Sequence, residues 1–226
     1  MGLSMLDCQP VAPARRRLLI AGLALGAGLL GACGKKQPKG QAVPSGATVL
    51  ALGDSITFGT GAAPEASYPA ALARLTGWNV VNAGIPGNVT AQALERLPDL
   101  LKEHAPPLVL LSIGGNDLLR RLPEDQARAN IKSICVQVLA TGAQLLLIAV
   151  PAPSVAGAVV GSLSDHPMYG ELAAQLKLPL HAKGWSQVLS DKTLRADAIH
   201  ANAQGYERFA RGLFESLKAL GLFETP

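Results

Sequence analysis

A serine and a histidine that lie far apart in the sequence have the residue types and neighbours needed for nucleophilic catalysis. Ser55 closely follows the apolar run Thr48–Leu52, and His200 has a carboxylate, Asp197, three positions before it. A hydroxyl becomes a good nucleophile when an imidazole takes its proton and a carboxylate orients that imidazole. These residues therefore predict a serine hydrolase, with Ser55 as nucleophile, His200 as base and Asp197 as the orienting acid.

Each of these residues also has a simpler structural interpretation. Ser55 could cap the helix that follows the strand, and Asp197 with His200 could be a capping pair on the surface. Asp165 and His166 form a competing pair of acid and histidine, but they fall in a predicted loop, where such residues often serve turns.

The oxyanion that forms during acyl transfer needs preorganised hydrogen-bond donors. The sequence offers three: the backbone N–H of Ser55, a glycine N–H after the second predicted strand, and the side-chain amide of Asn116. Of the two glycines, Gly84 is expected to serve the turn, whereas Gly87 allows close backbone approach. Asp54 is adjacent to the nucleophile, where side chains on a turn diverge, so we expect a structural hydrogen-bonding role for it.

Short apolar runs alternate with amphipathic helical patterns along the chain. The runs lack strict alternation, as expected for parallel strands covered on both faces. They are Thr48–Leu52, Val80–Asn82, Leu108–Ile113, Gln144–Val150 and a shorter Leu178–Leu180. Apolar residues at spacings of three and four predict helices around residues 94–104, 131–138 and 206–220. This alternation predicts one α/β domain with a doubly wound sheet of about five parallel strands.

Polar clusters follow the first three predicted strands, at Gly53–Ser55, Gly84–Asn88 and Gly114–Asp117. In open parallel sheets, ligands bind outside the carboxyl ends of the strands. The clusters are therefore expected to meet at one edge of the sheet. The segment Ala152–Pro167, rich in Gly, Ser and Pro, is predicted to be a long loop that lines a substrate groove beside them.

Residues 1–32 have the pattern of an export signal rather than of a fold. Arg15–Arg17 form a basic region, and the uncharged run Leu18–Leu30 that follows is shorter than the ~20 residues that span a bilayer. Small residues before Cys33 resemble the bacterial lipobox, in which cleavage of a lipoprotein signal peptide frees the cysteine for acylation. We expect lipidation at Cys33 and an exported protein held at the periplasmic face of a bacterial membrane. A plain secretory signal, with the protein in the periplasm, and an uncleaved anchor remain alternatives.

The stretch after Cys33 is basic and rich in Gly, Pro and Gln, which predicts a flexible tether over residues 33–46. The catalytic domain would then occupy residues 47–226, enough for a sizeable core. The net charge of +4 falls to about +2 without residues 1–32, which carry three arginines and Asp7, and this is too small to indicate a nucleic-acid partner. Cys135 is predicted to be a buried apolar residue, and no intramolecular disulfide is expected in the mature chain.

Four short blocks resemble those of the SGNH hydrolases, also called the GDSL esterase and lipase family. Gly53–Ile56 matches the first block, with isoleucine in place of the usual leucine, and Asn82–Asn88 matches the second. Gly114–Asp117 and Asp197–His200 match the third and fourth, with Ala201 where the family often has proline.

The resemblance covers residues 48–220, and residues 91–117 look most like the bacterial acyl-CoA thioesterase, lysophospholipase and arylesterase group. It implies a flavodoxin-like three-layer α/β/α sandwich with no metal and no organic cofactor. It also implies an acyl-enzyme mechanism on the catalytic residues named above, with Gly87 as the oxyanion glycine. The expected substrate is a small-molecule acyl ester or thioester, or a lipid-like ester.

Two other functions stay open. A carbohydrate O-acetylesterase of the same fold would use the same residues and prefer acetyl groups on sugars. A non-catalytic lipoprotein that serves as a binding module would need no reactive serine. The chain contains neither Gly-x-x-x-x-Gly-Lys-Ser/Thr nor a clear dinucleotide fingerprint, so nothing supports nucleotide binding.

Overall fold

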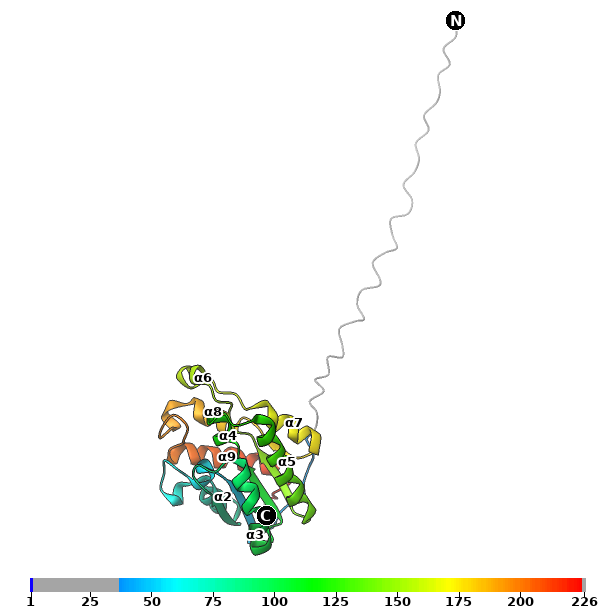
Figure 1. Ribbon diagram of the computed structural model, residues 1–226, viewed down its shortest axis with the longest axis vertical. Helices are drawn as coiled ribbons and strands as arrows, with labels where there is room; N and C mark the ends of the chain where they lie inside the picture. The colour runs from blue at the N-terminus through cyan, green and yellow to red at the C-terminus, as the bar shows by residue number, and fades with distance from the viewer. Residues whose placement is uncertain (2–36, 225–226) are drawn as a thin grey trace. The chain divides into compact units, whose positions relative to one another are not determined.

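The computed structural model describes Met1 and residues 37–224, and all that follows concerns residues 37–224 (Figure 1). The predicted signal peptide over residues 1–32 and the predicted lipidation site at Cys33 lie outside the described residues. None of the helices described has the length and hydrophobicity needed to span a membrane.

A sheet of five parallel strands forms the centre of the domain. In spatial order the strands are β2 (Asn79–Gly84), β1 (Thr48–Gly53), β3 (Leu108–Ser112), β4 (Gln144–Ile148) and β5 (Leu180–His181). The predicted strands are confirmed, with ends that differ by at most two residues. Because β2 and β3 pair with opposite sides of β1, the winding direction reverses at β1, which is where open α/β sheets bind ligands.

Helices cover both faces of the sheet, which confirms the predicted three-layer sandwich (Figure 1). One face is covered by α2 (Tyr68–Thr76), α8 (Gly184–Ser190) and α9 (Ala203–Ala219). The other face is covered by α3 (Thr90–His104), α5 (Glu124–Ala140) and α7 (Pro167–Leu176). The short helices that follow β1, β3 and β4 are α1 (Ser55–Phe58), α4 (Gly115–Leu119) and α6 (Val155–Val160). Two 3₁₀ turns are η1 (Pro64–Ala66) and η2 (Lys192–Leu194).

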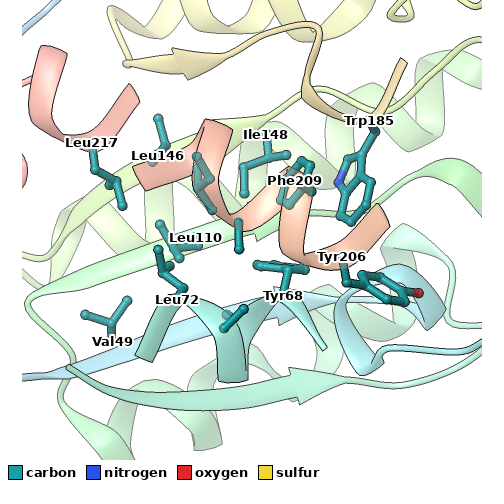
Figure 2. Close-up of a cluster of buried hydrophobic side chains, with 14 of the residues drawn as sticks. Val49, Tyr68, Leu72, Leu110, Leu146, Ile148, Trp185, Tyr206, Phe209 and Leu217 are labelled. Atoms are coloured by element: carbon teal, nitrogen blue, oxygen red, sulfur yellow. The ribbon is translucent and has the colours of Figure 1, made fainter. Parts of the chain in front are cut away.

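Side chains of the strands alternate between two buried apolar layers, because successive residues of a strand point to opposite faces. Val49 of β1 faces the layer beneath α9, whereas Leu50 faces the layer beneath α3 and α5. Figure 2 shows the first layer, in which the rings of Trp185 and Phe209 stack with their centroids 3.5 Å apart. This packing fixes α8 and α9 on the sheet, and with them the segment between these helices.

Residues 37–46, called the strap below, are bonded to the domain instead of forming part of a flexible tether. The backbone of Gln41 exchanges two hydrogen bonds, of 2.6 and 2.8 Å, with the side chain of Gln144 at the start of β4. Val43 is buried, and its carbonyl accepts from the indole N–H of Trp78 at 3.1 Å. The tether predicted over residues 33–46 is therefore wrong for the strap, because composition does not reveal backbone pairing.

The predicted loop 152–167 contains a helix, α6, that the sequence analysis missed. Ser154 caps its start by accepting from the N–H of Gly157 at 2.9 Å, and Gly161 ends it in the left-handed conformation. Small residues hide the helical period in this segment. Cys135 is buried in α5, as expected, and burial raises the pKa of its thiol to about 12, which makes it a poor nucleophile.

Candidate active site

Ser55 is the first residue of α1, directly after the tip of β1. Gly53 ends the strand in such close contact that a Cβ at this position would collide with Thr57 and with the carbonyl of Ser112. Glycine is therefore required for α1 and β3 to lie this close to the end of β1. The turn leaves the Ser55 side chain half-buried at the carboxyl edge of the sheet.

Asp54 caps α1, since its Oδ1 accepts from the backbone N–H of Ile56 at 3.1 Å. Its side chain is buried, and burial raises the pKa of Asp54 to about 6, although the bond from Ile56 and the nearby His200 lower it. The structural hydrogen-bonding role expected for Asp54 is confirmed.

The structure brings together the three side chains that the sequence analysis combined. The hydroxyl oxygen of Ser55 lies 2.9 Å from Nε2 of His200, and Nδ1 of His200 lies 2.7 Å from Oδ2 of Asp197. A carboxylate at Nδ1 favours the tautomer that carries its proton there, which leaves the Nε2 lone pair facing the hydroxyl. This geometry suits proton transfer from Ser55 to His200.

The loop between η2 and α9 holds the histidine in place. Arg195 and Ala201 pair as an antiparallel bridge across its base. Oδ1 of Asp197 accepts from the backbone N–H groups of Ile199 and His200, at 2.8 Å each. Partial burial raises the pKa of Asp197, but the hydrogen bonds from His200 and Ile199 outweigh it and lower that pKa below its usual value. Asp197 is therefore ionised at neutral pH, and it shapes the loop as well as orienting the imidazole.

The predicted oxyanion residues flank the nucleophile from the two neighbouring strands. Asn116 is the second residue of α4, and its Nδ2 donates to the carbonyl of Asn88 at 3.0 Å. An amide has two protons, so the second can serve another acceptor. Gly87 follows β2 with φ of +79°, a conformation that favours glycine, and its carbonyl accepts from Arg120 at 2.9 Å. Asn116 and Ser55 line the cavity described next, but Gly87 does not.

A cavity of about 940 Å³ opens beside Ser55. Its walls come from α4, from α6 with the loop that carries it, and from the segment between η2 and His200. Much of the lining is apolar, including Val150, Val155, Ala158, Val159, Leu163 and Leu189. Val155 and Val159 are also widely exposed to solvent, so the α6 wall is open and can contact an apolar group of a ligand.

Two sets of polar contacts support this edge of the sheet, and neither was predicted. The backbone N–H and the hydroxyl of Thr90 donate to the carboxylate of Asp117, at 2.9 and 2.6 Å. Asn130 of α5 donates to the same hydroxyl at 3.0 Å. Arg96 of α3 reaches Asn88 and the carbonyl of Gly53. The sequence offered one signal for this role: Arg96 is a charged residue on a helix whose apolar residues pack on the sheet.

The competing pair Asp165 and His166 lies away from Ser55 and does not line the cavity. His166 caps α7 by accepting from Met168 at 3.4 Å, and its Nε2 lies 3.6 Å from a carboxylate oxygen of Glu124. Asp165 accepts from the backbone N–H of Lys183 at 2.6 Å. Both side chains therefore stabilise their loop.

Comparison with known proteins of similar sequence agrees with the function that this geometry indicates. The chain is 33% identical over 178 residues to the thioesterase 1/protease 1/lysophospholipase L1 of Escherichia coli K12, across 76% of this chain and 84% of that protein. It is 33% identical over 182 residues to the esterase TesA of Pseudomonas aeruginosa, across 76% of this chain and 89% of that protein. A crystal structure of TesA superposes with a TM-score of 0.66 at 31% identity, and covers 76% of this chain and 99% of the TesA chain.

The profile of the GDSL-like lipase/acylhydrolase family matches residues 51–208, a range that includes the end of β1, the nucleophile turn and the histidine loop. Such a match, together with two relatives named for ester hydrolysis, identifies small ester or lipid molecules as the class of substrate. The chain belongs to the GDSL-like lipase/acylhydrolase family, the SGNH hydrolases, and is a hydrolase of ester bonds.

Proposed function

We propose that this protein is a serine esterase that hydrolyses acyl esters or thioesters through a covalent acyl-enzyme. The observation that carries this proposal is the continuous chain of short contacts from Ser55 to His200 to Asp197, of 2.9 and 2.7 Å, at the edge of a largely apolar cavity.

In the first half-reaction the hydroxyl oxygen of Ser55 attacks the acyl carbonyl, while Nε2 of His200 takes the hydroxyl proton. The oxyanion accepts hydrogen bonds from the backbone N–H groups of Ser55 and Gly87 and from the Asn116 amide. Asp197 stabilises the imidazolium. The bond to the leaving group then breaks, and the leaving oxygen or sulfur takes the proton from Nε2.

In the second half-reaction a water molecule attacks the acyl-enzyme, and His200 takes its proton. The bond between the acyl carbon and the Ser55 oxygen breaks, the carboxylic acid leaves, and His200 returns the proton to Ser55.

The cavity supports acyl groups longer than acetyl, because its apolar lining includes an exposed wall that an acyl chain would cover. Each buried methylene contributes about 0.8 kcal/mol, so a longer chain binds more tightly where it has apolar wall to cover. Arylesters, thioesters and lysophospholipids are the substrates proposed. A strong preference for acetyl groups on sugars would instead show a carbohydrate O-acetylesterase.

The proposal for its location is an exported lipoprotein, acylated at Cys33 and held at the periplasmic face of a bacterial membrane. It is supported by the basic and apolar segments before Cys33. Mass spectrometry of the N-terminal peptide from protein made in its native host should show a diacylated or triacylated cysteine. A free thiol at Cys33, or an N-terminus at another residue, would contradict it.

The catalytic proposal is tested with Ser55→Ala and a fluorophosphonate probe. The variant should keep the wild-type circular dichroism and melting temperature, and lose a factor of at least ~10³ in kcat on nitrophenyl esters. The probe should label Ser55 and not Ser154, which lines the same cavity but whose hydroxyl oxygen caps α6 by accepting from Gly157. Wild-type hydrolysis by Ser55→Ala, or labelling elsewhere, would refute the mechanism. A folded protein that neither hydrolyses esters nor reacts with the probe would be a binding module.

A further inference from the structure

Cationic side chains predominate at the mouth of the cavity. Arg121, Lys192 and Arg195 line it, and within residues 37–224 none of them forms an ion pair. The carboxylates that line the cavity are Asp54, which is buried and caps α1, and Asp197, which is bonded to His200. The three cationic side chains are thus the charged groups of the cavity lining that are available to bind a ligand.

Two of these cations lie on the side of the cavity where the leaving group must emerge. The leaving atom receives its proton from Nε2 of His200, so it has to face the loop that carries this histidine. Arg195 begins that loop, and Lys192 starts the 3₁₀ turn just before it. An anionic group on the alcohol or thiol would therefore pass close to both side chains.

The guanidinium of Arg195 is held at this position. Both terminal nitrogens lie 3.4 Å from the carbonyl of Ala158 in α6, and the residue is half-buried. The carboxylate of Asp191, next to Lys192 in the sequence, is bonded within η2, where it accepts from the N–H and hydroxyl of Thr193 at 2.9 and 2.7 Å. It does not line the cavity. A guanidinium has five N–H donors and the Ala158 carbonyl engages two, so Arg195, which lines the cavity, keeps donors for an anion.

We propose that Lys192 and Arg195 form a subsite for a negatively charged leaving group, so that esters whose alcohol or thiol carries a phosphate, sulfonate or carboxylate are preferred to neutral ones. This subsite rests on the proposed function, because it needs a leaving group protonated by His200. Arg121 serves as an internal comparison: it follows α4, the element of Asn116, and lies on the oxyanion side of the cavity.

The test compares nitrophenyl octanoate with the same ester carrying a carboxylate on the ring. The quantity measured is the ratio of kcat/KM for the charged ester to kcat/KM for the neutral ester. The double variant Lys192→Gln with Arg195→Gln should lower this ratio about tenfold, mostly through KM, because two attractive charges are lost near the surface. Raising the salt concentration to about 0.5 M should lower the ratio of the wild type but not that of the variant.

Matched variants separate a binding charge from a structural effect. Arg195→Lys keeps the charge and should keep most of the preference, whereas Arg121→Gln should change the ratio less than Arg195→Gln does. Lys132→Gln removes an exposed positive charge from α5, outside the cavity, and should leave the ratio unchanged. If Arg195→Gln fails to fold, the exposed Lys192→Gln alone should still lower the ratio about threefold.

Two outcomes distinguish failure of the subsite proposal from failure of the esterase proposal. A ratio that is equal in wild type and double variant, with the neutral ester still hydrolysed, would overturn the subsite and leave the esterase proposal standing. A wild-type protein that hydrolyses neither ester would overturn the proposed function, and the subsite with it.

Discussion

The guanidinium of Arg96 donates a hydrogen bond of 2.9 Å to the carbonyl of Gly53, two residues before the proposed nucleophile. Its Nε also donates to the side chain of Asn88 at 3.1 Å, and the carbonyl of Asn88 accepts from Asn116. One half-buried side chain on α3 thus connects the nucleophile turn with the segments that carry the oxyanion donors. Burial lowers the pKa of Arg96, because a charge is less favourable away from water.

Arg96→Met is expected to lower kcat about tenfold with KM nearly unchanged, because misplaced oxyanion donors weaken binding of the transition state more than binding of substrate. Steady-state kinetics on nitrophenyl butyrate measures both constants. Arg96→Lys should restore part of kcat, since an ammonium can reach one acceptor. Lys102→Met, an exposed change on the same helix, is the control. An increase in KM alone would contradict this positioning role.

Asp197→Asn is expected to keep the fold of the histidine loop but lower kcat by a factor of roughly 10⁴. The amide oxygen can still accept from the backbone of Ile199, while the amide nitrogen donates to Nδ1 of His200. The proton then sits on Nε2, so the imidazole can no longer take the proton of Ser55. Steady-state hydrolysis rates measure the effect. Asp125→Asn, at the start of α5 and outside the cavity lining, is the control. Wild-type kcat in Asp197→Asn would disprove the role of this carboxylate.

His181 is expected to make the protein less stable in acid. It is 5% exposed, and its Nδ1 lies 2.7 Å from the hydroxyl of Ser216. Burial lowers the pKa of His181 from 6.5 to about 4, although the charge of Asp165 raises it. Since the unfolded chain binds the proton more tightly, this contribution is complete above pH 6.5 and is lost as the pH falls toward 4. A difference of about 2.5 pH units at ~1.4 kcal/mol each amounts to ~3 kcal/mol.

Urea unfolding between pH 4.5 and 8 measures this effect. The free energy of unfolding of His181→Gln should fall less steeply below pH 6.5 than that of the wild type. Parallel curves for the two proteins would mean that His181 titrates alike in the folded and unfolded states.

Removing the strap is expected to destabilise the domain. A chain of residues 47–226 loses the burial of Val43 and leaves the indole N–H of Trp78 without its acceptor. Each loss is worth about 1–3 kcal/mol, so its free energy of unfolding should be at least ~2 kcal/mol below that of residues 37–226. Thermal melts of the two proteins test this, with Gln144→Ala in the longer one as a milder change, because it removes both bonds to the backbone of Gln41. Equal melting temperatures would show that the strap contributes nothing.

The layered fold and the meeting of Ser55 with His200 follow from patterns visible in the sequence. Short buried strands alternate with helices, and parallel strands bring their carboxyl ends to one edge, so clusters that follow different strands must meet there. The roles of the glycine before the nucleophile and of the carboxylate three residues before the histidine could be predicted from local geometry alone. These features depend on periodicity and short spacing, which a single sequence contains.

The strap, α6 and the contacts of Arg96 could not be predicted in the same way. Hydrogen bonds between the backbone of Gln41 and the side chain of Gln144 join residues about a hundred positions apart, and composition says nothing of such pairing. The helix α6 is built from small residues and valines without an apolar stripe, so no period marks it. The acceptors of Arg96 depend on tertiary packing.

The strap follows the side of the sheet that β4 and β5 form. The side chain of Gln37 accepts from the backbone N–H of Leu180, which pairs with Leu147 near the end of β4, whereas the backbone of Gln41 is bonded to Gln144 at the start of the same strand. A mechanical pull on residue 37 would therefore be taken up first by β5 and β4. Because β3 lies between these strands and β1, the strand that leads to Ser55 would bear such a load last.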